Sequence, residues 1–371
     1  MSIKVSIITP CLNSAGTIKD TIESVLNQTY GNIEYIIVDG ASTDRTVAII
    51  DEYCTVSKGR LKYISERDNG IYDAMNKGIM LAAGDVIGII NSDDWYVPDA
   101  VEKAVGCFEK TGAGVVYGEI WVINEKNEWE YHTAHNLFPP HPSTFIRRAV
   151  YQKYGLYDTK YRIAADRDLL LHFMTKQVQF AHVDEILANF RKTGISNTNS
   201  MECAKETYEI NRKYLGKCPE NILSKKAVEE KYTRDKFLYV SKKRPEIIRN
   251  ILSTYYNISD GLVIFGVGAC GKELEVILRM CDIPIRFLVD NDEKKWGLEL
   301  NGKKIFSPEI LRYGSAHVIV TVAGFQADIC EQLQSYLNPR LTWSVLDGIR
   351  QSAISQCNSL FVQQEISESG R

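Results

Sequence analysis

Short apolar runs alternate with segments of helical periodicity through the first hundred residues of the chain. The apolar runs lie at residues 4–9, 34–38, 61–64 and 86–90, and most are rich in the β-branched residues of buried strands. Helical spacing of apolar residues occurs between them at 18–26, 46–53 and 71–83. This order predicts a mostly parallel α/β sheet covered on both faces, and we expect Pro10 to end its first strand.

Polar side chains follow each of these predicted strands at its carboxyl end. Asn13 follows the first strand, Asp39 the second, Asp68 the third, and Asp93 with Asp94 the fourth. The carboxyl ends of parallel strands meet at one edge of a sheet, which is where ligands bind in folds of this class. The four polar loops therefore predict one binding site.

The adjacent carboxylates of Asp93 and Asp94 are the strongest chemical signal in this region. Two neighbouring carboxylates repel each other unless a cation or hydrogen-bond donors neutralise them, and a divalent metal joining Asp94 to an anionic substrate would do so. Alternatively, the pair could cap a helix predicted at residues 97–108. Neither a glycine-rich phosphate loop nor a Walker sequence follows the first strand, so a diphosphate bound here would need a metal.

Five segments of the sequence resemble the inverting family 2 glycosyltransferases, which have the GT-A fold. They lie at residues 5–13, 34–44, 68–78, 91–94 and 164–169, all in the family's order and spacing. The resemblance implies a metal-dependent, hexosyltransferase-type enzyme. Such an enzyme moves a sugar from a nucleoside diphosphate to a hydroxyl group and inverts the anomeric carbon.

The resemblance also implies roles for residues around the sugar donor. Asp39 matches the aspartate that accepts a hydrogen bond from the base, which favours UDP- or dTDP-sugars because uracil and thymine offer a ring N–H. The structural alternative for Asp39 is a turn that holds Gly40. Asp94 would bind Mn²⁺ or Mg²⁺. The other donor-binding residues by this resemblance are Pro10, Asn13, Arg67, Asp68, Asp93 and Arg191. The alternative for Arg67 is a solvated surface charge, and that for Arg191 is a simple basic turn.

Asp166 matches the family's catalytic base, which would take the proton of the acceptor hydroxyl. The sequence departs from the family pattern at Ala165, where glutamate is common. Asp168 is the alternative base, and one of the two aspartates could cap a helix predicted at residues 169–175. His141 lies in a proline-rich loop where the family often carries a histidine. A role in the site and a structural role are both open for it.

A second α/β unit is predicted near the carboxyl terminus. A strand at residues 261–265 leads into Gly266, Gly268 and Gly271, and a helix and a further strand then end at Asp290. This pattern is the dinucleotide-binding fingerprint, and it resembles Rossmann-like domains appended to some glycosyltransferases. Binding of NAD or a nucleotide and a purely structural or regulatory role both remain open.

These features divide the chain into four parts. We expect a GT-A domain at residues 1–200, a helical connector at 201–257, a Rossmann-like domain at 258–349 and a disordered tail at 350–371. The connector carries basic pairs that could touch an anionic membrane surface, although solvated helix faces explain them more simply.

Composition narrows the class of protein. A net charge of -3 gives no bulk attraction to nucleic acid. The nine cysteines include no Cys-x-x-Cys pair, which predicts reduced thiols and a cytoplasmic protein. We find neither a signal peptide nor a long apolar span, so we expect any membrane contact to be peripheral, at the inner face of the cell membrane.

The function predicted from these features is sugar transfer to a glycan or lipid-linked acceptor, in the synthesis of bacterial surface polysaccharide. The alternatives are a non-catalytic regulatory or scaffold protein that binds a nucleotide-sugar or NAD, and an oxidoreductase that works through the carboxyl-terminal unit. The donor sugar, the acceptor and the oligomeric state are left open.

Overall fold

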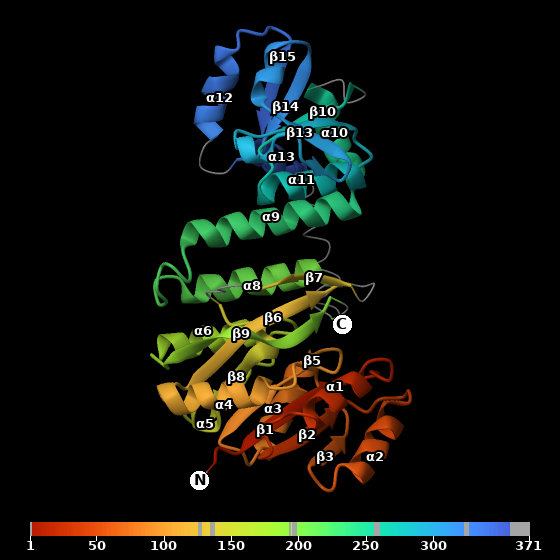
Figure 1. The fold of residues 1–371 in the computed structure, drawn as a ribbon, viewed down its shortest axis with the longest axis vertical. Helices are drawn as coiled ribbons and strands as arrows, with labels where there is room; N and C mark the ends of the chain where they lie inside the picture. The colour runs from red at the N-terminus through yellow and green to blue at the C-terminus, as the bar shows by residue number, and fades with distance from the viewer. Residues whose placement is uncertain are drawn as a thin grey trace. The chain divides into compact units, whose positions relative to one another are not determined.

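The computed structural model of the chain describes residues 2–124, 128–133, 138–192, 194, 199–255, 260–322 and 326–356. They form two compact units, Met1–Val228 and Glu229–Arg371, each built around its own sheet (Figure 1). The boundary between the units falls within the segment predicted as a helical connector. The four-part division of the chain stays a prediction.

The first unit is built on a mixed sheet, with nine strands among the described residues in the order β3-β2-β1-β4-β8-β6-β9-β5 and β7 paired to β6. The pairs β1–β2, β2–β3, β1–β4 and β6–β9 are parallel, and β8 runs antiparallel between β4 and β6. This arrangement confirms the predicted fold class. The strands are β1 (Val5–Cys11), β2 (Ile33–Asp39), β3 (Leu61–Ser65), β4 (Val86–Ile89), β5 (Trp95–Tyr96), β6 (Val115–Ile123), β7 (Trp129–His132), β8 (Thr144–Arg147) and β9 (Phe180–Arg191).

Helices bury both faces of this sheet. Alternate residues of β1 point to opposite faces, so Ile7 packs into one apolar core and Ile8 into the other. The helices are α1 (Ile18–Leu26), α2 (Thr46–Val56), α3 (Ile71–Leu81), α4 (Ala100–Thr111), the 3-10 helix η1 (His141–Ser143), α5 (Arg148–Tyr154), α6 (Ala165–Thr175) and α8 (Ser200–Tyr214).

Strand β1 continues through Pro10 to Cys11, so the prediction that Pro10 ends it is wrong. β1 pairs with β4 only as far as Ile8, whose carbonyl accepts a hydrogen bond from Ile90, and it pairs with β2 through Cys11. The nitrogen of Pro10 points to the same side of β1 as that of Ile8, which is the side of β4. At the level of Pro10, β4 has already ended. The proline therefore costs no hydrogen bond of the ladder.

Strand β7 is largely exposed, and sequence periodicity does not predict it. β7 pairs antiparallel with β6, and the ring of Trp129 packs edge-on against Trp121 at 5.4 Å between centroids. More than half of the Trp129 side chain is exposed, so the strand does not show the burial pattern that sequence periodicity detects.

The second unit has a smaller sheet, with six strands among the described residues in the order β12-β13-β11-β10-β14-β15. All pairs are parallel except β12–β13, and the parallel strands follow the doubly wound order. Its strands are β10 (Leu262–Phe265), β11 (Ile285–Val289), β12 (Glu299–Leu300), β13 (Lys303–Phe306), β14 (Ala316–Val320) and β15 (Leu341–Val345). Its helices are α10 (Pro245–Tyr255), α11 (Ala269–Met280), α12 (Gln326–Ser335) and α13 (Leu346–Gln356), with 3-10 turns η3 (Glu293–Lys295) and η4 (Pro308–Arg312), while α9 (Lys225–Lys243) contains the boundary.

Helix α13 extends into the part of the chain predicted as a tail. Residues 350–356 are helical because Leu346, Ile349 and Ala353 recur at helical spacing and are buried. Residues 357–371 lie outside the described part of the chain.

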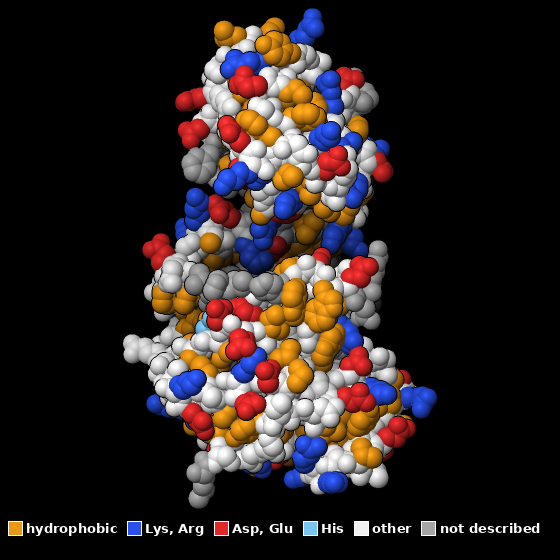
Figure 2. Space-filling model, in the orientation of Figure 1, with side chains coloured by type: hydrophobic (Ala, Val, Ile, Leu, Met, Phe, Trp, Pro, Cys, Tyr) orange, Lys and Arg blue, Asp and Glu red, His pale blue; other side chains and the backbone are white. Residues whose placement is uncertain are grey.

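The distribution of surface charges and the state of the cysteines agree with what the composition predicts. Acidic and basic side chains intermingle on the face of the molecule shown in Figure 2. The eight cysteines within the described residues are all free. Across the same residues, every helix falls short of the combination of length and apolar character that crossing a membrane requires.

Candidate active site

A cavity of about 690 Å³ lies at the carboxyl ends of β1 and β4 in the first unit. It is lined by the loops after these strands, the start of α3, the 3-10 helix η1 and the segment that leads into α6. Predicted site residues that line it are Pro10, Asn13, Asp68, Asp93, His141 and Asp166. Among these six residues, Pro10 and Asp166 lie 156 positions apart in the sequence, and the fold brings them into one cavity.

Asp39 lies behind the wall of this cavity. Its buried carboxylate accepts hydrogen bonds from the backbone N–H of Ser42 at 2.9 Å and from the hydroxyl of Ser65 at 2.7 Å. Asn13 binds the same loop, since its N–H donates to the Ser42 hydroxyl at 2.7 Å and its side-chain oxygen accepts from the N–H of Thr43 at 2.9 Å. These bonds hold the loops after β1 and β2 against each other.

Asp68 and Arg67 are neighbours in sequence but lie in different environments. Asp68 lines the cavity, and its Oδ1 accepts a hydrogen bond from Gly70 N at 2.9 Å. A Cβ atom at Gly40 would lie only 2.6 Å from Asp68 Oδ2, so glycine at this position lets the Asp68 side chain approach the loop after β2 closely. The Arg67 side chain is exposed and lies outside the lining of the cavity.

Asp94 is fully buried at the end of the loop after β4. Its Oδ1 accepts a hydrogen bond from Arg191 N at 3.0 Å, whereas its buried Oδ2 has no hydrogen-bond partner among the described residues. Burial, reinforced by the charge of Asp93, raises the pKa of Asp94 well above its usual value. Helix α4 begins at Ala100, so the alternative in which the two aspartates cap a helix is wrong.

Arg191, at the end of β9, holds the same loop in place. Its Nη1 donates to the carbonyl of Asp93 at 2.9 Å, and its Nη2 pairs with Asp20 at 2.6 Å. The guanidinium lies over the ring of Trp95, 4.4 Å from the centroid. Arg191 is absent from the lining of the cavity.

The surroundings of Asp94 fit a divalent cation. A buried carboxylate is stable in its ionised form only with a partner that neutralises it. In the described part of the chain, Asp94 has one N–H donor and one oxygen without a partner. Asp93 is the next residue and lines the cavity. Mg²⁺ and Mn²⁺ prefer oxygen ligands of this kind.

Asp166 lies in the first turn of α6, at the edge of the cavity. The helix begins at Ala165 with Ala164 as its N-cap, so the prediction that an aspartate caps a helix starting at residue 169 is wrong. The hydroxyl of Tyr72 donates to the carbonyl of Ile163 at 2.6 Å and lies 3.2 Å from Asp166 Oδ1. Burial, together with the charge of Asp166, raises the pKa of Tyr72, which keeps this hydroxyl protonated.

Asp168 lies outside the lining of the cavity. Its side chain is almost completely buried and forms an ion pair with Lys213 of α8 at 2.7 Å. Between the two aspartates, Arg167 donates to the side-chain oxygen of Asn211 at 2.6 Å and lies over the ring of Phe138. Of the two aspartates, only Asp166 is part of the cavity lining.

His141 opens the short helix η1 and lines the cavity near Asp166. Its Nε2 is buried without a hydrogen-bond partner among the described residues. Burial lowers the pKa of His141. The charge of Asp166 raises it by less, so the imidazole is neutral at neutral pH. The hydroxyl of Ser143 donates to the carbonyl of Gly118 at 2.6 Å and fixes the turn.

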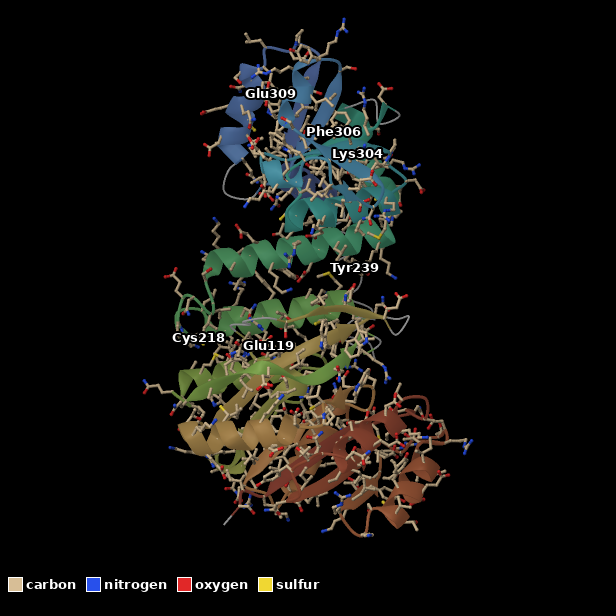
Figure 3. The ribbon with its side chains drawn as sticks, viewed as in Figure 1. Glu119, Cys218, Tyr239, Lys304, Phe306 and Glu309 are labelled. Carbon is tan, nitrogen blue, oxygen red and sulfur yellow. The ribbon has the colours of Figure 1, made fainter. Side chains whose placement is uncertain are left out.

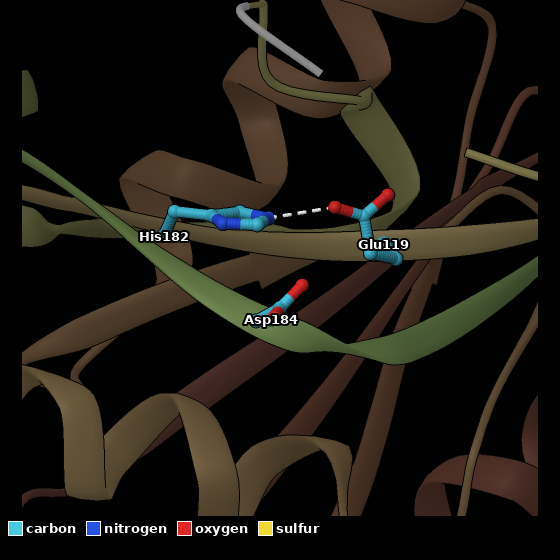
Figure 4. A group of neighbouring side chains, drawn as sticks. All are labelled: Glu119, His182 and Asp184. Atoms are coloured by element: carbon cyan, nitrogen blue, oxygen red, sulfur yellow. Dashed lines mark hydrogen bonds and ion pairs between the residues drawn. The ribbon is translucent and has the colours of Figure 1, made fainter. Parts of the chain in front are cut away.

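A second group of possible metal ligands lies away from this cavity, on β6 and β9. Glu119 (labelled in Figure 3), His182 and Asp184 place their ligand atoms within 4.8 Å of one another (Figure 4). The Nε2 of His182 lies 2.8 Å from Glu119 Oε1. A separate cavity beside them also contains Lys103, which pairs with Asp99 at 3.0 Å and supplies positive charge there. Sequence analysis missed this group. Its members share no motif, and only two of them, His182 and Asp184, lie on the same strand, β9.

In the second unit, the predicted glycine fingerprint forms the turn between β10 and α11. A Cβ atom at Gly271 would lie 1.8 Å from the carbonyl oxygen of Gly266, and Gly266 itself has a φ of +97°. The Asp290 carboxylate accepts hydrogen bonds from Val267 N at 2.7 Å and Lys295 Nζ at 3.0 Å. Although burial alone would raise the pKa of Asp290, these bonds lower it. The acid of the predicted fingerprint is therefore engaged within its own unit, and this geometry gives no support to NAD.

Comparisons with known proteins agree with this architecture. Residues 6–170 match the model of glycosyl transferase family 2, and residues 258–339 match a model described as C2185-like, N-terminal. A PGL/p-HBAD biosynthesis glycosyltransferase of Mycobacterium tuberculosis is 30% identical over 202 residues, which are 52% of this chain and 79% of that protein. An uncharacterized glycosyltransferase of Rickettsia typhi is 29% identical over 225 residues, 55% of this chain and 69% of that protein.

Two solved structures share the fold. The mannosyltransferase PcManGT from Pyrobaculum calidifontis, in complex with GDP-Man and Mn²⁺, has a TM-score of 0.54 and 14% identity. The match covers 76% of this chain and 86% of that one. TarS of S. aureus has a TM-score of 0.51 and 15% identity, over 69% of this chain and 50% of that one. These likenesses confirm the GT-A fold, and the identity and coverage of the mycobacterial relative show that the chain belongs to the family 2 glycosyltransferases.

Proposed function

We propose that the first unit transfers a sugar from a nucleoside diphosphate to a hydroxyl group and inverts the anomeric carbon. The observation that carries this proposal is the shared cavity of Asp93 and Asp166, which lie far apart in the sequence. A cavity of about 690 Å³ is of the size that holds a small organic ligand. Membership of the family supports sugar transfer as the reaction.

The loops after β1, β2 and β4 would bind the donor. Asp39 and Asn13 hold the first two loops together, and Asp68 forms part of the wall beside them. UDP- and dTDP-sugars remain the favoured donors through the resemblance of Asp39 to the family's base-binding aspartate, since a carboxylate suits a ring N–H. A Mn²⁺ or Mg²⁺ ion held by Asp94, with Asp93 beside it, would offset the charge that builds on the departing nucleoside diphosphate. The Mn²⁺ complex of the archaeal mannosyltransferase is consistent with such an ion.

Asp166 would act as the base. Its carboxylate takes the proton of the acceptor hydroxyl while the acceptor oxygen bonds to the anomeric carbon and the bond to the nucleoside diphosphate breaks. A single displacement of this kind inverts the anomeric carbon. The ion pair of Asp168 with Lys213 favours Asp166 for this role. The neutral imidazole of His141 would bind a hydroxyl group of a sugar.

The acceptor is proposed to be a glycan or a lipid-linked intermediate of a bacterial surface polysaccharide. The name of the mycobacterial relative, which places that protein in PGL/p-HBAD biosynthesis, supports an acceptor of this general kind. We also propose that the protein works in the cytoplasm, at the inner face of the cell membrane when it meets such an acceptor.

Donor hydrolysis and transfer test the proposal directly. A panel of UDP-, dTDP- and GDP-sugars is incubated with and without Mn²⁺, using the wild type, Asp94→Ala, Asp166→Asn and the surface control Asp158→Asn. We expect metal-dependent turnover of one donor that is lost in Asp94→Ala and retained in Asp158→Asn. Asp166→Asn is expected to bind that donor and to transfer nothing. Donor binding without turnover in the wild type, with candidate acceptors present, would instead favour a regulatory or scaffold protein.

A further inference from the structure

Helix α8 lies beyond the residues that match the family model, yet it binds the segment that carries Asp166. Glu206 of this helix accepts hydrogen bonds from three consecutive backbone N–H groups. The Glu206 Oε1 accepts from Arg162 N at 2.7 Å, and its Oε2 accepts from Ile163 N and Ala164 N, both at 2.9 Å. One carboxylate thus holds the three residues that precede helix α6.

The N-terminus of α6 needs such a partner. Its N-cap is Ala164, which has no side-chain oxygen to bind the unpaired N–H groups at a helix start. Glu206, from a neighbouring helix, accepts from the N–H of this N-cap residue and from those of the two residues before it. Its negative charge suits the positive end of the α6 dipole. Charged acceptors form the stronger class of hydrogen bond, so this contact is well suited to fixing the backbone.

The contact continues from Glu206 to the proposed base through Ile163. The Ile163 N–H donates to Glu206, and its carbonyl accepts from the hydroxyl of Tyr72, which lies 3.2 Å from Asp166 Oδ1. Arg162 and Ile163 also line the cavity. The two contacts described above, Asn211 with Arg167 and Lys213 with Asp168, join the same helices at the two residues that follow Asp166.

We propose that Glu206 is a positioning residue, which sets the place of Asp166 in the cavity by holding the backbone of residues 162–164. This inference rests on the proposed role of Asp166 as base. It assigns α8 to the active site of the first unit, even though the family motifs end before that helix begins. A small displacement of a catalytic group costs up to about 100-fold in rate, so loss of this contact should act on turnover.

The test compares Glu206→Ala and Glu206→Gln with the matched control Glu209→Gln, an exposed glutamate on the same helix. Glutamine keeps the size of the side chain but replaces one acceptor oxygen by an N–H donor, so at least one of the three bonds is lost. Hydrogen–deuterium exchange at residues 162–164 reports the contact without any turnover. We expect exchange there to accelerate by about tenfold or more in both Glu206 variants and to stay unchanged in Glu209→Gln.

Kinetics then separate positioning from general damage. We expect kcat to fall by about 10- to 100-fold in both Glu206 variants while the KM and the Kd of the donor stay within about twofold of the wild type. Unchanged exchange at residues 162–164 in Glu206→Ala, or faster exchange with an unchanged kcat, would overturn the proposal. Full transfer by Asp166→Asn would refute the proposed base, while the exchange result for Glu206 would still stand. The two failures are therefore distinguishable.

Discussion

Replacing Asp94 by asparagine is expected to stabilise the first unit while it abolishes transfer. Asp94 is fully buried, one of its oxygens lacks a partner among the described residues, and the charge of Asp93 lies beside it. Without a metal, ionisation of this carboxyl therefore opposes folding. Asparagine keeps the shape and the acceptor for Arg191 N, and it carries no charge at any pH.

The direction of the pKa shift sets the dependence on pH. Because the pKa of Asp94 is raised in the folded state, the protonated carboxyl adds stability at low pH, and this stability is lost as the pH rises through the folded-state pKa. Removal of a poorly compensated buried charge is worth about 1–3 kcal/mol. For a unit of this size, that corresponds to a rise in Tm of roughly 2–10 °C.

Calorimetry in EDTA between pH 5 and pH 8 provides the assay. We expect the Tm of Asp94→Asn to exceed that of the wild type, by a margin that grows from pH 5 to pH 8. A variant that is less stable than the wild type, or a margin that shrinks with rising pH, would refute this account of the buried carboxylate.

The remaining predictions concern the metal, the base and the second unit. Saturating Mn²⁺ should raise the free energy of unfolding of the wild type by about 2.7 kcal/mol at 100 times its Kd, and with it the Tm, and should leave both unchanged in Asp94→Asn. Loss of the effect in Asp184→Asn instead would place the ion at the β6–β9 group. Tyr72→Phe removes the hydroxyl near Asp166, so it should lower kcat by about tenfold in steady-state kinetics and leave the Kd of the donor unchanged. An unchanged kcat would contradict a role of this hydroxyl in catalysis. Gly271→Ala should destabilise the second unit by about 1–3 kcal/mol in denaturant unfolding, since its Cβ atom would overlap Gly266. The matched control Gly268→Ala, with open space around its Cβ position, should be neutral, and equal effects of the two would contradict the steric argument.

Several features of this protein follow from the chain itself. Apolar runs that alternate with segments of helical periodicity predict both α/β units, because the spacing of apolar residues follows from the face that each strand or helix buries. The position of a residue just after a parallel strand predicts that it lies at the ligand edge, and Asn13, Asp68 and Asp93 do line the cavity. The glycine turn of the second unit was equally predictable, since sterics alone require glycine at Gly266 and Gly271.

Other features depend on partners that sequence separation hides. The sequence leaves Asp168 open as an alternative to Asp166, and the structural difference between them comes from Lys213, which pairs with Asp168. Asp39 resembles an exposed loop acid in the sequence, but hydrogen bonds from the loop after β2 and from the last residue of β3 accompany its complete burial. Pro10 remains within its strand because the neighbouring strand β4 has already ended.

The sequence by itself determined the family, the fold class and the set of acids near the ligand edge, because these depend on local periodicity and on motifs. Only the tertiary structure decided which acid lines the cavity and which side chain holds it. The contact of Glu206 with residues 162–164 spans more than 40 positions, and no local pattern encodes a partner at that distance. Such contacts form because folding places α8 beside the start of α6, where unpaired N–H groups require an acceptor.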